Sequence, residues 1–335
     1  MRNLTQRERV INTVLHKPAD FIPHQLDVTQ DTDERLEKYF GDKEYLYTVA
    51  DNHLVRAKNK NHKLINSDSY KDLFGVIWNI DRQNGDIGIV KDYILKAPDI
   101  SNYIFPKASY ELISSKCEEL IKNHPGRFRI FEIGLSFFER AWTLRGMEDL
   151  LVDMMLEEEF ACLLLDRIME YNLDVINIAA KFDIDCIMLG DDWGQQNGLI
   201  MGYPIWKKLI FPRLKIQYEA IKSHKLFVAQ HSCGDNRELF KDLIEIGLDI
   251  YNTFQPEIYD FNKFKQEYGK YITIYGGIST QGVLSRGTPE QVYDEVKRTI
   301  EILGYGGGYI TAPTHQCTSG VPAKNITAFI KATKN

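Results

Sequence analysis

The sequence predicts an α/β protein, a single-domain (β/α)8 barrel of the TIM type, and two observations lead to this fold class. Short apolar runs alternate with longer amphipathic segments, and such alternation implies a parallel sheet covered by helices. Candidate strands lie at 21–25, 129–134, 185–190, 226–230, 249–253, 271–276 and 309–312. Seven or eight such units over about 300 residues suit a barrel. A doubly wound sheet is the alternative, but no Gly-x-Gly-x-x-Gly motif follows the first strand.

The predicted helices fill the intervals between these strands. They cover 111–122, two segments within 147–181, and 204–223, 237–246, 289–303 and 322–333. The helix at 289 has a clear start, with Thr288 as N-cap, proline in the first position and Gln291 in the third. A helix also precedes the first strand, because Thr5 and Glu8 fit a capping box. No linker divides the chain, so we expect one domain over 1–335.

One segment, 70–95, breaks the alternation. Asn84-Gly85 is a strong signal for a tight hairpin turn, and apolar runs at 74–79 and 87–90 flank it. We therefore expect a β-hairpin inserted early in the barrel, packed either over its mouth or on its flank.

The composition restricts the class of function. With 335 residues, 44% of them hydrophobic, the chain can bury a large core. Its net charge of −6 gives no indication of a nucleic acid or of an anionic membrane as partner. No apolar stretch approaches the roughly 20 residues of a membrane span, and the polar start is not a signal peptide. Five cysteines without a Cys-x-x-Cys pair argue against a disulfide framework, so we expect a cytoplasmic protein.

His231-Ser232-Cys233, at the end of the apolar run 226–230, is the strongest chemical signal. Residues i and i+2 of a strand point to the same side, so an imidazole and a thiolate can converge on one metal. Cys317 would add a third ligand from the last strand. Nitrogen and sulfur donors favour zinc, and three protein ligands leave a coordination position open for catalysis. The alternative is a buried cysteine and a core histidine that are close only in sequence.

Further polar residues follow the predicted strands. In a barrel the reactive groups come from the carboxyl ends of the strands, which favours an enzyme over an interaction scaffold. The candidates for catalysis or substrate binding are His24, Glu139, Asp191, Asp192, Trp193 and His315. Glu139 has an alternative role in an ion pair with Arg140 or Arg145, and Asp192 has one as a loop or helix-cap carboxylate.

Several motifs together resemble the uroporphyrinogen decarboxylase superfamily over nearly the whole chain. They are Arg-Glu-Arg-Val at 7–10, Gly-Asp-Asp-Trp-Gly at 190–194, His-Ser-Cys-Gly-Asp at 231–235, Gly-Gly-Ile at 276–278, and Gly-Gly-Gly-Tyr-Ile at 306–310 through Val-Pro at 321–322. The resemblance implies a distorted single-domain (β/α)8 barrel. The decarboxylase branch carries an arginine-containing N-terminal signature, whereas this chain has Phe-Ile-Pro-His-Gln-Leu-Asp at 21–27. The zinc-dependent corrinoid methyltransferase branch carries His-x-Cys and a distant cysteine, which match His231, Cys233 and Cys317.

The second branch implies a methyltransferase. Such an enzyme moves a methyl group between a small methylated compound, often a methoxylated one in O-demethylation, or a thiol, and a corrinoid protein. Zinc lowers the pKa of an acceptor thiol or polarises the leaving heteroatom. The nearest match to a corrinoid-binding Asp-x-His-x-x-Gly loop is 51–56, which lacks the glycine. We therefore expect the corrinoid (cobalamin) to be supplied by a separate partner protein.

Two alternatives stay open. One is a decarboxylase of a porphyrinogen-like or other carboxylate substrate. The other is a non-catalytic barrel that keeps zinc as a structural clip, since His315 and Cys317 form a second His-x-Cys pair that could close a His2Cys2 set. We expect His315 on the substrate side instead, with water, substrate or Glu139 in the fourth position.

Overall fold

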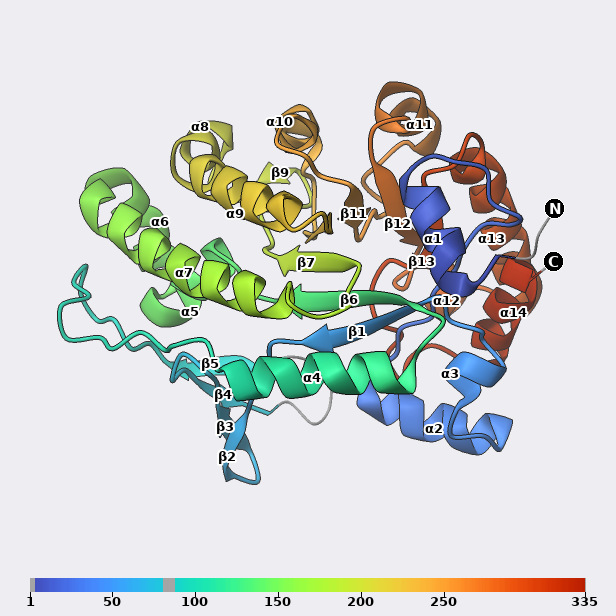
Figure 1. The fold of residues 1–335 in the computed structure, drawn as a ribbon, viewed down its shortest axis with the longest axis horizontal. Coiled ribbons are helices and arrows are strands. Elements are labelled where there is room, and N and C mark those ends of the chain that lie inside the picture. Colours follow the sequence, from blue (N-terminus) through green and yellow to red (C-terminus); the bar gives the residue numbers. More distant parts are fainter. Residues whose placement is uncertain (1–3, 81–87, 335) are drawn as a thin grey trace. The chain divides into compact units, whose positions relative to one another are not determined.

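The computed structural model describes residues 4–80 and 88–334. Six of the seven predicted strands are strands in the structure, with ends that agree within two residues, and parallel strands alternate with helices (Figure 1). The chain forms two compact units. Unit 1 comprises Met1–Val55, His124–Arg129 and Leu248–Asn335; unit 2 comprises Arg56–Asn123 and Ile130–Gly247. The single domain over 1–335 stays a prediction.

In unit 1 three parallel strands form the sheet. They are β11 (Ile250–Asn252), β12 (Thr273–Ile278) and β13 (Tyr309–Pro313). The first predicted strand, 21–25, is an extended segment in the structure, with a parallel bridge between His24 and Thr311 of β13; Val28, just after it, bridges to Cys317. Its helices are α1 (Gln6–Val14), α2 (Gln30–Phe40), α3 (Tyr45–Thr48), α11 (Phe261–Tyr268), α12 (Val283–Arg286), α13 (Pro289–Gly304) and α14 (Ala323–Lys334).

Two helix starts of unit 1 confirm the sequence prediction. Thr5 and Glu8 form a complete capping box at α1, and Thr288 and Gln291 form another at α13. Each box satisfies two backbone N–H groups that the first turn leaves without an intrahelical partner. The apolar faces of α2, α13 and α14 then pack into one buried cluster.

In unit 2 the sheet contains β1 (Leu54–Lys58, of which Arg56–Lys58 belong to this unit) and three strands that pair in parallel. They are β6 (Phe128–Ile133, of which Ile130–Ile133 belong to this unit), β7 (Cys186–Gly190) and β10 (Phe227–His231). The helices are α4 (Tyr110–Asn123), α5 (Phe138–Arg145), α6 (Met147–Leu156), α7 (Glu158–Ala179), α8 (Tyr203–Ile205), α9 (Phe211–Ser223) and α10 (Phe240–Glu245). A π-helical turn, η1 (Trp206–Ile210), precedes α9, and a 3-10 turn, η2 (Arg237–Leu239), precedes α10. Helix α5, which follows β6, was not predicted from the sequence.

The insertion in unit 2 is larger than the predicted hairpin. It is a four-stranded antiparallel sheet of β2 (Lys63–Asn66), β3 (Ser69–Lys71), β4 (Ile77–Asn79) and β5 (Ile89–Asp92). Strands β4 and β5 pair as expected, and the predicted Asn84-Gly85 turn lies outside the described residues. Asp72 fixes the insertion to α5, because it accepts hydrogen bonds from the N–H groups of Phe74 and Val76 and pairs with Arg140 at 2.7 Å.

The β7 strand is followed by an antiparallel ribbon of two strands of two residues each, β8 (Gly194–Gln195) and β9 (Gly198–Leu199). Of the helices that the structure describes, none combines the length and the apolar character needed to cross a membrane.

Candidate functional site

The imidazole of His231 and the thiol of Cys233 lie together after β10. His231 is the last residue of that strand, and its Nε2 lies 3.8 Å from Sγ of Cys233. Both side chains are half-buried. A nitrogen and a sulfur donor at this separation can reach a single metal ion.

Asp192, just after β7, borders this pair. Its Oδ1 accepts a hydrogen bond from the Cys233 N–H at 2.8 Å and lies 3.9 Å from Nε2 of His231. The loops after β7 and β10 approach so closely that a side chain at Gly234 would meet the backbone of Gly194 at 2.2 Å. Gly234 also has a φ of +79°, so glycine is required there on both grounds. The two glycines therefore keep Asp192 against the His231–Cys233 turn.

Asp191 is buried and caps α5. Its carboxylate accepts hydrogen bonds from the backbone N–H groups of Phe137 (3.2 Å), Phe138 (3.0 Å) and Glu139 (2.8 Å), and from Nε1 of Trp193 (2.5 Å). Phe137, the N-cap residue of α5, supplies no side-chain cap. A carboxylate at this position satisfies the free N–H groups and complements the helix dipole. Burial raises the pKa of Asp191 to about 6, although these four donors act in the opposite direction.

Glu139 lies in the first turn of α5, next to both aspartates. Burial raises the pKa of Glu139 well above its usual range, and the charges of Asp192 and Asp191 raise it further. Three carboxyl groups this close cannot all ionise at their ordinary pKa values. Glu139 is thus suited to hold and transfer a proton.

The two arginines that were candidates for an ion pair with Glu139 pair with other carboxylates. Arg140 pairs with Asp72 at 2.7 Å, and Arg145 pairs with Asp149 at 2.6 Å and Asp153 at 2.8 Å.

Trp193 is fully buried. Its ring packs edge-on against Trp206 with centroids 5.5 Å apart, and its Nε1–H is used by Asp191. Trp193 therefore supports the Asp191 carboxylate, and its direct role in substrate binding stays a prediction.

In unit 1, Cys317 is fully buried among apolar side chains that include Leu26, Ile278 and Val321. Burial raises the pKa of its thiol to about 12. A metal ligand must be a thiolate, so a metal would have to supply the stabilisation that this surrounding lacks. His315 is exposed.

His24 belongs to a buried polar network in unit 1. Its Nε2 hydrogen-bonds the carbonyl of Ala50 at 2.8 Å, and its ring lies 4.5 Å from that of His53. His53 contacts Nη1 of Arg9 at 2.9 Å, and Arg9 pairs with Asp20 at 2.6 Å. Burial lowers the pKa of His24 to about 4 and that of His53 to about 2, so both rings are neutral at pH 7.

Three cations of unit 2 were missed at the sequence level: Arg56, Lys58 and Lys60. Glu132 pairs with Arg56 at 3.6 Å and with Lys58 at 3.4 Å. The signal was present as cations at alternate positions, 56, 58 and 60, in a segment that becomes β1 (Leu54–Lys58) and the residues after it.

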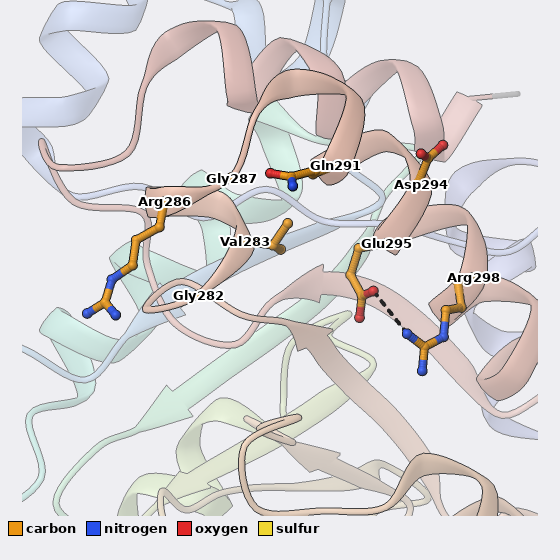
Figure 2. A pocket seen from close by; sticks show the side chains of 8 residues that line it. All are labelled: Gly282, Val283, Arg286, Gly287, Gln291, Asp294, Glu295 and Arg298. Atoms are coloured by element: carbon orange, nitrogen blue, oxygen red, sulfur yellow. Dashed lines mark ion pairs between the residues drawn. The ribbon is translucent and has the colours of Figure 1, made fainter.

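A surface cavity of about 590 Å³ in unit 1 does not contain any of the predicted site residues (Figure 2). It lies along α12 and α13, where Glu295 and Arg298 form an ion pair at 3.5 Å. Its lining is Gly282, Val283, Arg286, Gly287, Gln291, Asp294, Glu295 and Arg298.

Parallel strands that deliver a histidine, a cysteine and several carboxyl groups from their carboxyl ends define an α/β protein of the TIM type with a candidate active site. The family model described as uroporphyrinogen decarboxylase (URO-D) matches residues 95–335, and the chain belongs to this family.

Two individual proteins are similar to this chain, one in sequence and one in structure. A methylated-thiol–coenzyme M methyltransferase of Methanosarcina mazei is 20% identical over 221 residues, which are 65% of this chain and 56% of that protein. The match thus spans little more than half the length of that relative. The solved structure of a methyltransferase from Methanosarcina mazei superimposes with a TM-score of 0.77 at 15% identity, covering 99% of this chain and 98% of that one. This likeness confirms the predicted fold class, and the names of both proteins describe methyltransferases.

Proposed function

We propose that the protein is a zinc-dependent methyltransferase that moves a methyl group between a small methylated compound or a thiol and a corrinoid protein. The observation that carries this proposal is the 3.8 Å approach of His231 Nε2 and Cys233 Sγ beside Asp192. The name of the methylated-thiol relative supports the reaction class.

The donor set fits zinc. His231 supplies a nitrogen and Cys233 a sulfur, both of which zinc prefers, and Asp192 brings a carboxylate oxygen to 3.9 Å from the same imidazole nitrogen. Bound zinc would act as a Lewis acid on a thiol or on a leaving heteroatom. Cys317 as the third ligand stays a prediction from the sequence motif, as do Glu139 as a fourth ligand and His315 on the substrate side.

The residues of the chain have separate roles in this proposal. With water or substrate in the fourth zinc position, Glu139 holds the proton that a thiol releases or that a leaving oxygen or nitrogen requires. Asp191 is a positioning residue, because it fixes the α5 start that carries Glu139. The corrinoid comes with the separate partner protein.

Metal analysis and cobalt spectroscopy test the proposal. Purified protein should hold about one zinc per chain, and the cobalt absorption of the cognate corrinoid protein should change with a methyl donor only when zinc is present. Cys317→Ser should lose zinc, whereas Cys117→Ser, the matched change at a buried cysteine of α4, should keep it. Unchanged zinc content in Cys317→Ser would exclude Cys317 as a ligand. If methoxylated, methylated-amine and thiol compounds all gave no zinc-dependent change in the cobalt spectrum, the proposed methyl transfer would be excluded. Release of carbon dioxide from a porphyrinogen would favour the decarboxylase instead.

A further inference from the structure

Helix α6 of unit 2 carries large apolar side chains on its outward face. Seven of its ten residues are apolar. Leu150 and Met154 are buried, whereas Val152, Met155 and Leu156 are 53%, 70% and 75% exposed. A helix that is apolar on both sides is normally buried on both sides. We call Val152, Met155 and Leu156 the α6 patch.

The side chains of the α6 patch are neighbours on the helix surface. Val152 comes three residues before Met155 and four before Leu156, and residues at these spacings lie next to one another on a helix. Single exposed apolar residues are ordinary on a protein surface, but a contiguous group of them indicates an interaction site. Methionine suits such a site because its flexible side chain adapts to a partner. The α6 patch is therefore a surface that a second molecule can cover.

The α6 patch belongs to the end of unit 2 that holds the candidate active site. Asp191, directly after β7, accepts hydrogen bonds from the N–H groups of Phe138 and Glu139 at the start of α5. The eight residues of α5 span roughly 12 Å, and α6 begins two residues after α5 ends. Figure 1 shows α5 and α6 beyond the arrowheads of β6 and β7. A protein that brings a cofactor to this end of the sheet can therefore reach α6.

Exposed carboxylates border the α6 patch. The segment 147–159 contains six Asp and Glu residues and no Lys or Arg. The three residues after Leu156 are glutamates, at 157–159, and all are exposed; Glu158 pairs with Lys208. A two-fold dimer joins the same surface of both subunits, so a second copy of the chain would bring these carboxylates together. A different protein, with lysines and arginines around an apolar centre, complements this surface better.

We propose that the α6 patch docks the separate corrinoid protein, which meets it with an apolar surface bordered by lysines and arginines. This inference rests on the proposed function, because that function requires a corrinoid protein at the carboxyl ends of β7 and β10. The apolar centre supplies most of the affinity, and the carboxylate border steers the partner and fixes its orientation. The patch contacts the partner protein and not the methyl group.

Sedimentation of the full chain with the cognate corrinoid protein, followed by cobalt absorption, measures the docking without methyl transfer. Met155→Gln and Leu156→Gln should each weaken the binding about tenfold, and the two changes together should weaken it further. Both side chains are more than two-thirds exposed, so we expect the variants to fold, and thermal unfolding checks this.

The matched control is Ile216→Gln on α9, an apolar side chain of the same unit that is 43% exposed. It should bind the corrinoid protein like the unaltered chain.

The carboxylate border has a separate test. The double variant Glu157→Lys, Glu159→Lys should slow the association about tenfold at low salt and reduce its salt dependence, because charges at the edge of an interface act mainly on the association rate. The control is Glu219→Lys on α9, whose side chain is 63% exposed and which should associate at the unaltered rate.

Three results would overturn the inference. The first is unchanged binding in both Met155→Gln and Leu156→Gln, and the second is an equal loss in Ile216→Gln. The third is a dimer of the unaltered chain that Leu156→Gln dissociates, which would assign the patch to a second copy.

These results are distinct from a failure of the proposed function. Docking that depends on the α6 patch supports the inference even if no methyl transfer is found. Methyl transfer to free cobalamin, by a chain that does not bind the corrinoid protein through α6, would support the function and exclude the docking.

Discussion

Two polar clusters, one in each unit, each carry buried ionisable groups, and the two units offset the cost of that burial in different ways. The histidine network of unit 1 contains Arg9, Asp20, His24 and His53, and the carboxylate cluster of unit 2 contains Glu139, Asp191 and Asp192. In the histidine network, burial drives the imidazoles to their neutral form, and the one cation has a bidentate carboxylate partner. In the carboxylate cluster, like groups crowd together and raise the pKa of Glu139. The first arrangement supports the fold, whereas the second stores a proton near candidate metal ligands.

The largest effect should come from breaking the histidine network. Arg9→Ala removes the bidentate partner of Asp20 and a contact to His53, and should lower the free energy of unfolding by up to about 3 kcal/mol, because Arg9 is buried while Asp20 keeps access to solvent. Arg167→Ala, which breaks an exposed pair with Glu170, is the control and should cost at most about 1 kcal/mol. Urea unfolding measures both. Similar losses in the two variants would show that the network is no more important than a surface pair.

The pH dependence of stability follows from the same network. A histidine whose pKa is lowered by folding binds fewer protons in the native state, so stability is full above the unfolded pKa of 6.5 and falls as the pH drops. For His24 the loss between pH 6.5 and about 4 should reach about 3 kcal/mol. The lowered pKa of Asp20, about 2, adds a further loss only below pH 4. His24→Gln should flatten the upper part of this curve, and an unchanged slope would contradict the role of His24.

We expect zinc binding to depend on Cys233, which lies next to the carboxylate cluster, and not on the histidine network. Cys233→Ser should weaken zinc binding at least 100-fold, about 2.7 kcal/mol, because a hydroxyl is a poor replacement for a thiolate. Competition with a chromogenic chelator measures this affinity. Arg9→Ala should keep its zinc when folded. If folded Arg9→Ala lost its zinc while Cys233→Ser kept it, the metal would belong to the histidine network instead.

The smallest effect concerns Asp191. Asp191→Asn keeps one oxygen for the α5 N–H groups but removes the charge beside Glu139, so turnover should fall about tenfold, or 1.4 kcal/mol, at unchanged zinc content. Removing that charge also lowers the pKa of Glu139. The limb of the kcat/KM pH profile that reports Glu139 should therefore move to lower pH. A slower variant with an unshifted profile would leave Asp191 with a purely structural role.

Much of the architecture was predictable because it depends on local signals. Apolar periodicity identified six parallel strands and the main helices, and the Thr5–Glu8 and Thr288–Gln291 spacings identified two helix starts. The 231–233 spacing placed an imidazole and a thiol side by side, since strand geometry alone determines the direction of residues i and i+2.

The remaining features depend on contacts between segments far apart in the chain. Asp191 caps a helix that begins 53 residues earlier than itself, and that helix has no cap of its own for the sequence to reveal. Cys317 is enclosed by apolar side chains from several helices, which sets its pKa. Arg56 and Lys58 face Glu132 only because β1 and β6 lie together. The sequence alone determined the order of the strands and helices and the donor types, because these follow from local propensity and spacing. Only the tertiary structure decided which charges are buried, paired or crowded, because desolvation and Coulomb interactions depend on distances through space.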